Sequence, residues 1–150
     1  MPFTVAKKLR VQFRKELGKG YVLNAQLDPE LSRAVAQLAE ANESFVVRVD
    51  RIKGGQFWFS DHRVLFEYQS VHELFRYDSV RRCHWMFKNK QDRIEAEPGT
   101  GHDFKRKYGD RLEIDLGDRV CVLDGLAQAY LPIYNFFRWI LMPTPTEPAQ

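Results

Sequence analysis

Basic side chains gather in the first twenty residues of the chain, where they could bind an anionic surface. These residues include six lysines and arginines and one acid, whereas the other 130 residues hold 17 basic and 19 acidic side chains. Such cations attract lipid headgroups and nucleic-acid phosphates. We predict an anionic-surface site made of Lys7, Lys8, Arg10, Arg14 and Lys15. The alternative is an amphipathic helix that packs on the domain and leaves a solvated basic face.

A second group of cations lies in the body of the chain. The candidate secondary binding residues are Arg51, Lys53, Arg81 and Arg82. Near the last two, Trp85 and Phe87 interleave with basic residues, as in single-strand nucleic-acid platforms. Alternation along a strand would instead place Arg82 and His84 on one face and Cys83 on the other, which is typical of a strand with one core face. The net acidic body also argues against nucleic acid as a partner.

The cysteines and histidines do not form a catalytic or metal-binding pattern. Cys83 and His84 are neighbours, so a strand would point them to opposite faces. Cys121 and the remaining histidines lack the spacing of a ligand set. Residues 99–102, Gly-Thr-Gly-His, lack the strand, the full glycine pattern and the following helix of a nucleotide loop. We therefore expect no enzyme activity, metal or cofactor, and reduced thiols in a cytoplasmic protein.

Two helices are predicted before residue 44. Val5, Leu9, Phe13 and Leu17 recur four residues apart, which predicts a helix over 4–17 with cations on its other face. Asp28 can cap a helix and Pro29 suits a first helical position. The second helix is therefore expected to start there and to end near residue 42. Its expected buried stripe is Leu31, Val35 and Leu38.

From residue 44 onward, apolar and polar residues alternate, and this period of two predicts strands. Seven are expected, over 45–50, 56–59, 64–68, 72–77, 80–87, 112–116 and 119–123. The second and third form a hairpin, because Ser60, Asp61 and His62 supply turn chemistry between them. Its aromatic residues should be cross-strand pairs that cover a core. Residues 89–109 are a polar excursion whose structure the pattern leaves open.

The last apolar segment predicts a helix with two apolar faces. Asp124 can cap this helix, and Pro132 must either kink it or begin its main segment. A helix that covers one sheet needs a single apolar face, so the second face should meet another surface. That surface is the N-terminal helices, a second subunit or a membrane. The candidate interface residues are Phe136, Trp139 and Ile140.

One family resemblance follows from this order of elements and from one motif. The motif is a Gly-aromatic strand ending at Ser, a short turn and an Arg-led apolar strand, here Gly55, Phe57, Phe59, Ser60, Arg63, Leu65 and Phe66. It resembles the pleckstrin-homology (PH) superfold, in particular GRAM and bacterial PH-like domains, with Arg76 or Tyr77 in place of a usual proline. The resemblance implies an α+β, mainly β fold: a seven-stranded bent antiparallel barrel, capped by a C-terminal helix. It covers 44–141, after an N-terminal helical extension (1–43) and before a disordered tail (142–150).

The resemblance implies a non-catalytic binding or scaffold module. We expect a cytoplasmic protein, peripheral at the membrane, that attaches weakly and in a salt-sensitive way to an anionic membrane surface or ligand. Lipid-binding PH domains often place a basic motif around a long first loop. Arg51 and Lys53 fit this motif, but the short loop, with Asp61 and His62 nearby, disfavours a specific inositol-phosphate pocket. The alternative is a protein-interaction or homodimerisation module that uses the apolar C-terminal helix.

Overall fold

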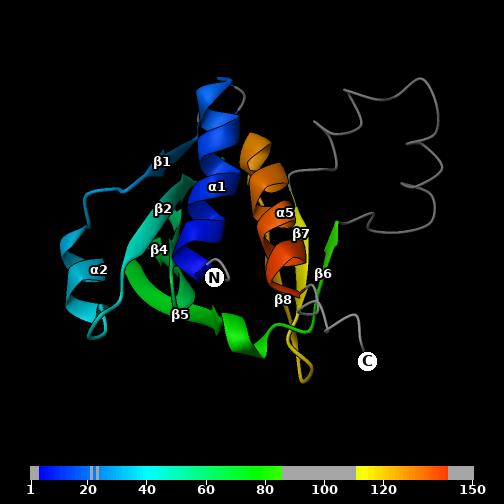
Figure 1. The fold of residues 1–150 in the computed structure, drawn as a ribbon. Helices are drawn as coiled ribbons and strands as arrows, with labels where there is room; N and C mark the ends of the chain where they lie inside the picture. The colour runs from blue at the N-terminus through cyan, green and yellow to red at the C-terminus, as the bar shows by residue number, and fades with distance from the viewer. Residues whose placement is uncertain (1–3, 21, 23, 86–110, 142–150) are drawn as a thin grey trace.

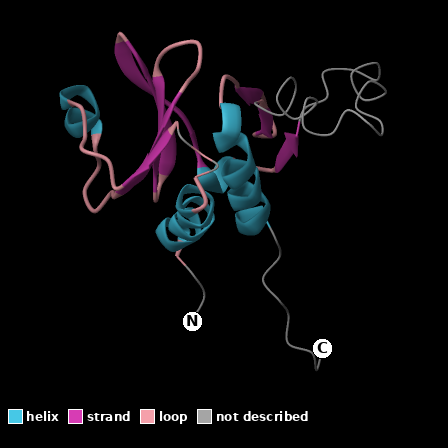
Figure 2. Cartoon of the chain, turned by 90° about the horizontal axis from the view of Figure 1, so that it is seen from above, coloured by secondary structure: helices cyan, strands magenta, loops and turns pink. Residues whose placement is uncertain are grey.

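The chain forms an α+β fold with two antiparallel sheets, an N-terminal helix and a C-terminal helix (Figures 1 and 2). The computed structural model describes residues 4–20, 22, 24–85 and 111–141. The helices are α1 (Val5–Gly18), α2 (Arg33–Leu38) and α5 (Tyr130–Leu141), with 3₁₀ turns η1 (Tyr77–Ser79) and η2 (Ala127–Ala129). None of the described helices is long and apolar enough to cross a membrane.

Eight strands in the described residues divide between the two sheets. The first sheet has the order β1-β2-β3-β4-β5 and the second has β6-β7-β8. The strands of the first are β1 (Ala25–Leu27), β2 (Phe45–Asp50), β3 (Gln56–Ser60), β4 (Arg63–Tyr68) and β5 (Ser70–Arg76). Those of the second are β6 (Arg82–Trp85), β7 (Leu112–Asp115) and β8 (Val120–Leu123). The expected strands correspond to β2–β8, whereas β1 was not predicted. The described strands form two separate sheets and no closed barrel, so the expected seven-stranded barrel is wrong in this respect. Residues 86–110 and 142–150 lie outside the described residues.

The first helix is confirmed, and the second begins later than expected. The Thr4 hydroxyl caps α1 by accepting a hydrogen bond from the Lys7 N–H. The prediction that Asp28 starts a helix is wrong: Asp28 has a positive φ of 49° and donates its N–H to the Val46 carbonyl at 2.7 Å. Ser32 is the cap of α2, and its hydroxyl accepts from the Val35 N–H. Leu38, expected in the buried stripe, is 43% exposed.

The final helix begins after residue 129, and the expected cap at Asp124 is also wrong. Asp124 instead accepts hydrogen bonds from Arg51, and η2 separates it from α5. Pro132 lies in the first turn of α5, where a missing N–H costs no helical hydrogen bond. The second of the two predicted roles for Pro132, at the start of the main segment, is therefore confirmed.

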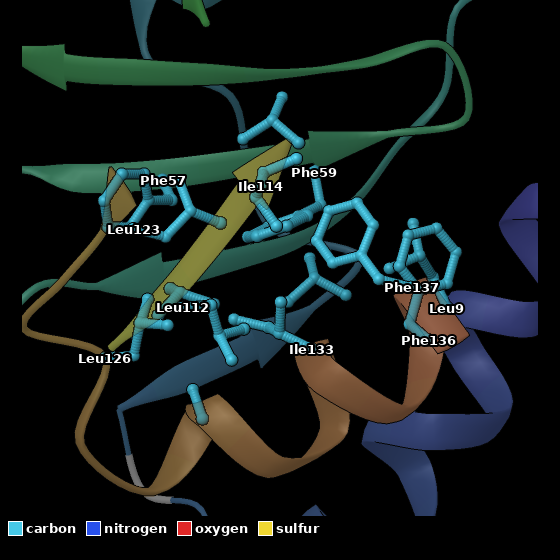
Figure 3. Close-up of a cluster of buried hydrophobic side chains, with 14 of the residues drawn as sticks. Leu9, Phe57, Phe59, Leu112, Ile114, Leu123, Leu126, Ile133, Phe136 and Phe137 are labelled. Carbon is cyan, nitrogen blue, oxygen red and sulfur yellow. The ribbon is translucent and has the colours of Figure 1, made fainter. Parts of the chain in front are cut away.

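The main core lies between the two sheets, α1 and α5. Figure 3 shows Phe57 and Phe59 of β3, Ile114 of β7 and Leu123 of β8 gathered with Leu9 of α1 and with Ile133, Phe136 and Phe137 of α5. All of these side chains are buried. Figures 1 and 2 place α1 and α5 side by side, and the two helices contact each other along their length. The second apolar face of α5 is therefore covered by α1, as in the first of the three alternatives above.

A smaller core on the other face of the first sheet explains the aromatic hairpin. Val35 of α2 covers Phe45, Trp58 and Leu65 there. Successive residues of β3 therefore face different cores, with Trp58 beneath α2 and its neighbours in the main core. The Trp58 Nε1–H and the Ser32 hydroxyl each donate to Glu67 at 3.0 Å. The Ser32 bond connects the start of the short helix α2 to β4, and the Trp58 bond joins β3 to β4.

Candidate functional site

The predicted anionic-surface residues of α1 differ in their exposure to solvent. Lys7, Arg14 and Lys15 are exposed, and we call these three residues the basic face of α1. Arg10 forms an ion pair with Asp28 in the chain that enters α2. The Lys8 ammonium lies 5.7 Å from the ring centroid of Trp139, within cation–π range.

The apolar stripe of α1 is not available to a lipid interface. Leu9 and Phe13 are completely buried against α5 and the first sheet. Val11, at 40% exposure, is the one large apolar residue of α1 that is markedly exposed among the described residues. The basic face can therefore attract an anionic surface by charge, with little apolar area to insert.

The secondary residues Arg51 and Lys53 are engaged in an internal contact. The Arg51 Nε and Nη2 donate to one carboxylate oxygen of Asp124 at 3.0 and 2.9 Å, and the Lys53 Nζ lies 3.8 Å from the other. The Ile52 N–H also donates to the Gly125 carbonyl at 2.8 Å. Gly125 has a φ of +66°, and a Cβ there would lie 2.8 Å from the Arg51 side chain. These contacts hold the β2–β3 turn against the chain that follows β8.

Arg81 and Arg82 are exposed on the second sheet, away from Arg51 and Lys53 on the first. Arg82 lies opposite Asp115 in the β6–β7 register. Arg82 and His84 are exposed while Cys83 is half-buried, which confirms the prediction of one core face. The structure therefore does not join the four secondary residues into one basic site.

Phe136, one of the three residues predicted to form an apolar interface, lies inside the core and cannot contact a partner. Its side chain is completely buried, with its ring centroid 5.3 Å from that of Tyr77. Trp139 and Ile140 are half-buried, and Lys8 of α1 lies over Trp139. Of the three surfaces that the sequence left open for this side of α5, the structure places α1 against part of it.

Both cysteines face the inner side of the second sheet. In the strand register, Cys83 and Cys121 lie on either side of Ile114, which is fully buried. Both are free thiols. Burial raises the pKa of Cys83 to about 12 and also raises the pKa of Cys121, so neither is a nucleophilic thiolate near neutral pH.

Sequence reasoning missed a buried ion pair at the closed end of the β3–β4 hairpin. The Arg63 Nε and Nη2 donate to the two carboxylate oxygens of Glu43 at 2.9 and 3.0 Å. The Glu43 side chain is fully buried and also accepts from the Ser60 hydroxyl at 2.6 Å. Arg63 further donates to the Leu38 carbonyl and to Glu73. The signal in the sequence was an arginine directly before the apolar residues of a strand, Val64, Leu65 and Phe66.

Burial and charge together set the protonation of this ion pair. Burial alone would raise the pKa of Glu43, but hydrogen bonds from Arg63 and Ser60 outweigh it, so the pKa is lowered. The hydrogen bonds to Glu43 raise the pKa of Arg63. The Tyr77 hydroxyl donates to the Ser60 carbonyl at 2.7 Å, and burial raises the pKa of Tyr77. Both members of the pair are therefore charged near neutral pH.

A more exposed set of charges surrounds the buried pair. Arg76 donates to both carboxylate oxygens of Glu40, and this contact lowers the pKa of Glu40 to about 2. Glu40, Glu43 and His62 have potential metal-ligand atoms within 4.8 Å of one another. However, Arg63 and Arg76 already bind both carboxylates, and their positive charges oppose a cation. This cluster holds the α2–β2 connection to the hairpin and is not a metal site.

Acid should destabilise the protein through the carboxylates of Glu40 and Glu43. Their pKa values in the folded state lie below the ordinary value of 4.5, so their stabilising contribution is fully present above that pH. The contribution disappears as pH falls through the folded-state pKa values, toward about 2 for Glu40. We expect the melting temperature to fall between about pH 4.5 and 2, less steeply in a Glu43→Gln variant. Equal slopes for both proteins would contradict this assignment.

The basic face of α1 is the candidate binding site of the described residues. Arg14 and Lys15 reach solvent, whereas Arg10 and Arg51 are engaged in ion pairs with other parts of the chain, and Lys7 is also exposed. No protein-family model, curated protein or solved structure matches the chain.

Proposed function

We propose that the chain is a non-catalytic binding module that attaches weakly to an anionic membrane surface through the basic face of α1. One observation carries the proposal. Arg14 and Lys15 are adjacent and exposed, and neither has an ion-pair partner among the described residues. Their charges are therefore available to an external anion. Lys7 lies two turns earlier on the same exposed side.

The order of strands supports assigning the module to the PH-like superfold. Strands β2–β5 lie together in the first sheet and β6–β8 in the second, and a helix follows them. Two sheets of five and three strands differ from the seven-stranded barrel that the resemblance implies, but the C-terminal helix packed on the core agrees with it. Strand β1 and helix α1 add to this arrangement at the N-terminal side, where β1 pairs with β2.

The attachment should be weak and sensitive to salt. Each lysine or arginine near an anionic leaflet contributes about 1 kcal/mol, and this attraction falls off within a Debye length of about 10 Å at 0.1 M salt. Because Leu9 and Phe13 are buried in the core, apolar insertion adds little to these charges. Three cations of the basic face thus support reversible, peripheral contact.

Co-sedimentation with vesicles tests the proposal. The protein would be mixed with vesicles of phosphatidylcholine alone or with added phosphatidylserine, at about 0.05 M and about 0.5 M salt. We expect binding only with phosphatidylserine, and mostly at low salt. Equal binding to neutral vesicles, or no binding to anionic vesicles at low salt, would contradict an electrostatic membrane role.

A further inference from the structure

The edge strand β8 exposes apolar side chains without a partner strand in the described residues. It lies at the end of the β6-β7-β8 sheet and pairs only with β7 there. Val120 is 55% exposed and Val122 is 38% exposed. Both side chains point to the outer face, because Cys121 and Leu123 between and beside them face inward. The strand thus offers an apolar row along an open edge.

The hydrogen-bond pattern identifies which backbone groups of β8 are open. The Leu116 N–H donates to the Arg119 carbonyl at 2.9 Å, which makes these two residues a hydrogen-bonded pair beside the turn. Hydrogen-bonded and non-hydrogen-bonded pairs alternate along an antiparallel ladder. Cys121 and Leu123 therefore bond to β7, whereas Val120 and Val122 direct their N–H and carbonyl groups away from β7. The same two valines carry the exposed side chains and the open backbone groups.

Strand β8 lacks the features that usually prevent edges from pairing. Natural edge strands carry charged residues or proline for this purpose. Strand β5, at the edge of the first sheet, carries Glu73 and Arg76. The sequence of β8, Val-Cys-Val-Leu, has neither charge nor proline. Its composition therefore favours the addition of another strand.

We propose that β8 pairs antiparallel with β8 of a second copy of this chain, about a two-fold axis at Cys121. In this register Val120 lies opposite the partner's Val122 and Val122 opposite the partner's Val120. Both are hydrogen-bonded pairs, so the open N–H and carbonyl groups of all four valines are satisfied. A shift by two residues would instead place Asp118 or Asp124 opposite a valine. The proposed register is the one antiparallel register that pairs every exposed valine with a valine. Beyond the strand ends it places Asp118 of each copy opposite the partner's Asp124, which weakens the contact.

The size of the contact determines how strong the association can be. A stable interface buries about 1,200–2,000 Å² in total, and two four-residue strands bury much less. The dimer should therefore form reversibly and only at high protein concentration. It does not depend on the basic face of α1, so vesicle binding and dimerisation can fail separately.

Sedimentation velocity over a range of protein concentrations, without vesicles, tests the association. We expect the average mass to rise from monomer toward dimer with concentration. Val122→Pro should keep the protein monomeric, because it removes an N–H that would bond to the partner strand. The variant should still fold, because β7 does not use that N–H. Val120→Lys should act in the same way if the proline variant does not fold. The matched control Val11→Lys, at the exposed valine of α1, should leave the dimer intact.

Amide hydrogen exchange locates the contact. At high concentration the amides of Val120 and Val122 should become protected, whereas those of Cys121 and Leu123 should be protected at every concentration. The proposal would be overturned by a wild-type protein that stays monomeric throughout. It would also be overturned by a dimer that the β8 substitutions leave unchanged, or by protection that does not involve Val120 and Val122.

Discussion

Replacing Arg63 with methionine should lower the free energy of unfolding by about 3–5 kcal/mol, because it leaves a buried carboxylate without its counter-charge. The Glu43 side chain is fully buried and receives two of its hydrogen bonds from this guanidinium. The variant also loses the donor to the Leu38 carbonyl, which fixes the end of α2. Urea unfolding at pH 7, followed by tryptophan fluorescence, measures the change.

Two further variants distinguish the buried pair from ordinary surface charge. Arg76→Met removes a cation that also binds Glu40, but both partners are over one-third exposed. Its cost should be much smaller than that of Arg63→Met, because solvent screens this exposed pair. Replacing both members, Arg63→Met with Glu43→Leu, should recover part of the loss, because no buried charge is left unpaired. An Arg63→Met protein within about 1 kcal/mol of wild type would contradict this account of the pair.

Phe13→Ala should cost about 3–5 kcal/mol, because α1 supplies part of the main core. The Phe13 side chain is completely buried in the cluster that includes Phe136 and Phe137. The matched control is Arg14→Ala, the next residue, which is exposed on the other side of the helix and should change stability by less than about 0.5 kcal/mol. Urea unfolding measures both changes. Similar small effects for both would show that α1 is a dispensable extension.

Because α1 packs into the main core, its basic face cannot be tested by deleting the helix. Deleting the helix would remove Leu9 and Phe13 from the core together with the cations. A loss of vesicle binding could then reflect unfolding. Substitutions of exposed cations, which leave the buried residues in place, separate these effects.

The strands could be predicted from sequence because their apolar residues alternate with a period of two. Strand β1 could not, because three residues are too few for a pattern and its place depends on pairing with β2. The misplaced start of α2 has a similar cause. Asp28 and Pro29 have the local chemistry of a helix start, but Ser32 can both cap the helix and donate to Glu67, 35 residues away. Asp28 and Ser32 are both plausible caps by local chemistry, and the long-range contact of Ser32 with Glu67 favours Ser32.

The same limit applies to the binding residues. Sequence identified the cations of α1 and their common face, which follow from helical spacing. It could not show that Arg10 binds Asp28 or that Arg51 binds Asp124, since these partners are 18 and 73 residues away. The buried pair of Arg63 and Glu43, 20 residues apart, was missed for the same reason. Which charges remain available to a ligand is a property of the folded chain.

The most direct measurement compares vesicle binding by two variants that each lose two positive charges. One carries Arg14→Gln and Lys15→Gln on the basic face of α1. The other carries Arg33→Gln on α2 and Arg82→Gln on β6, both exposed positions elsewhere. With anionic vesicles at low salt, the first should lose most of its binding and the second should retain it. Equal losses in both variants, or retention by the first, would contradict attachment through α1.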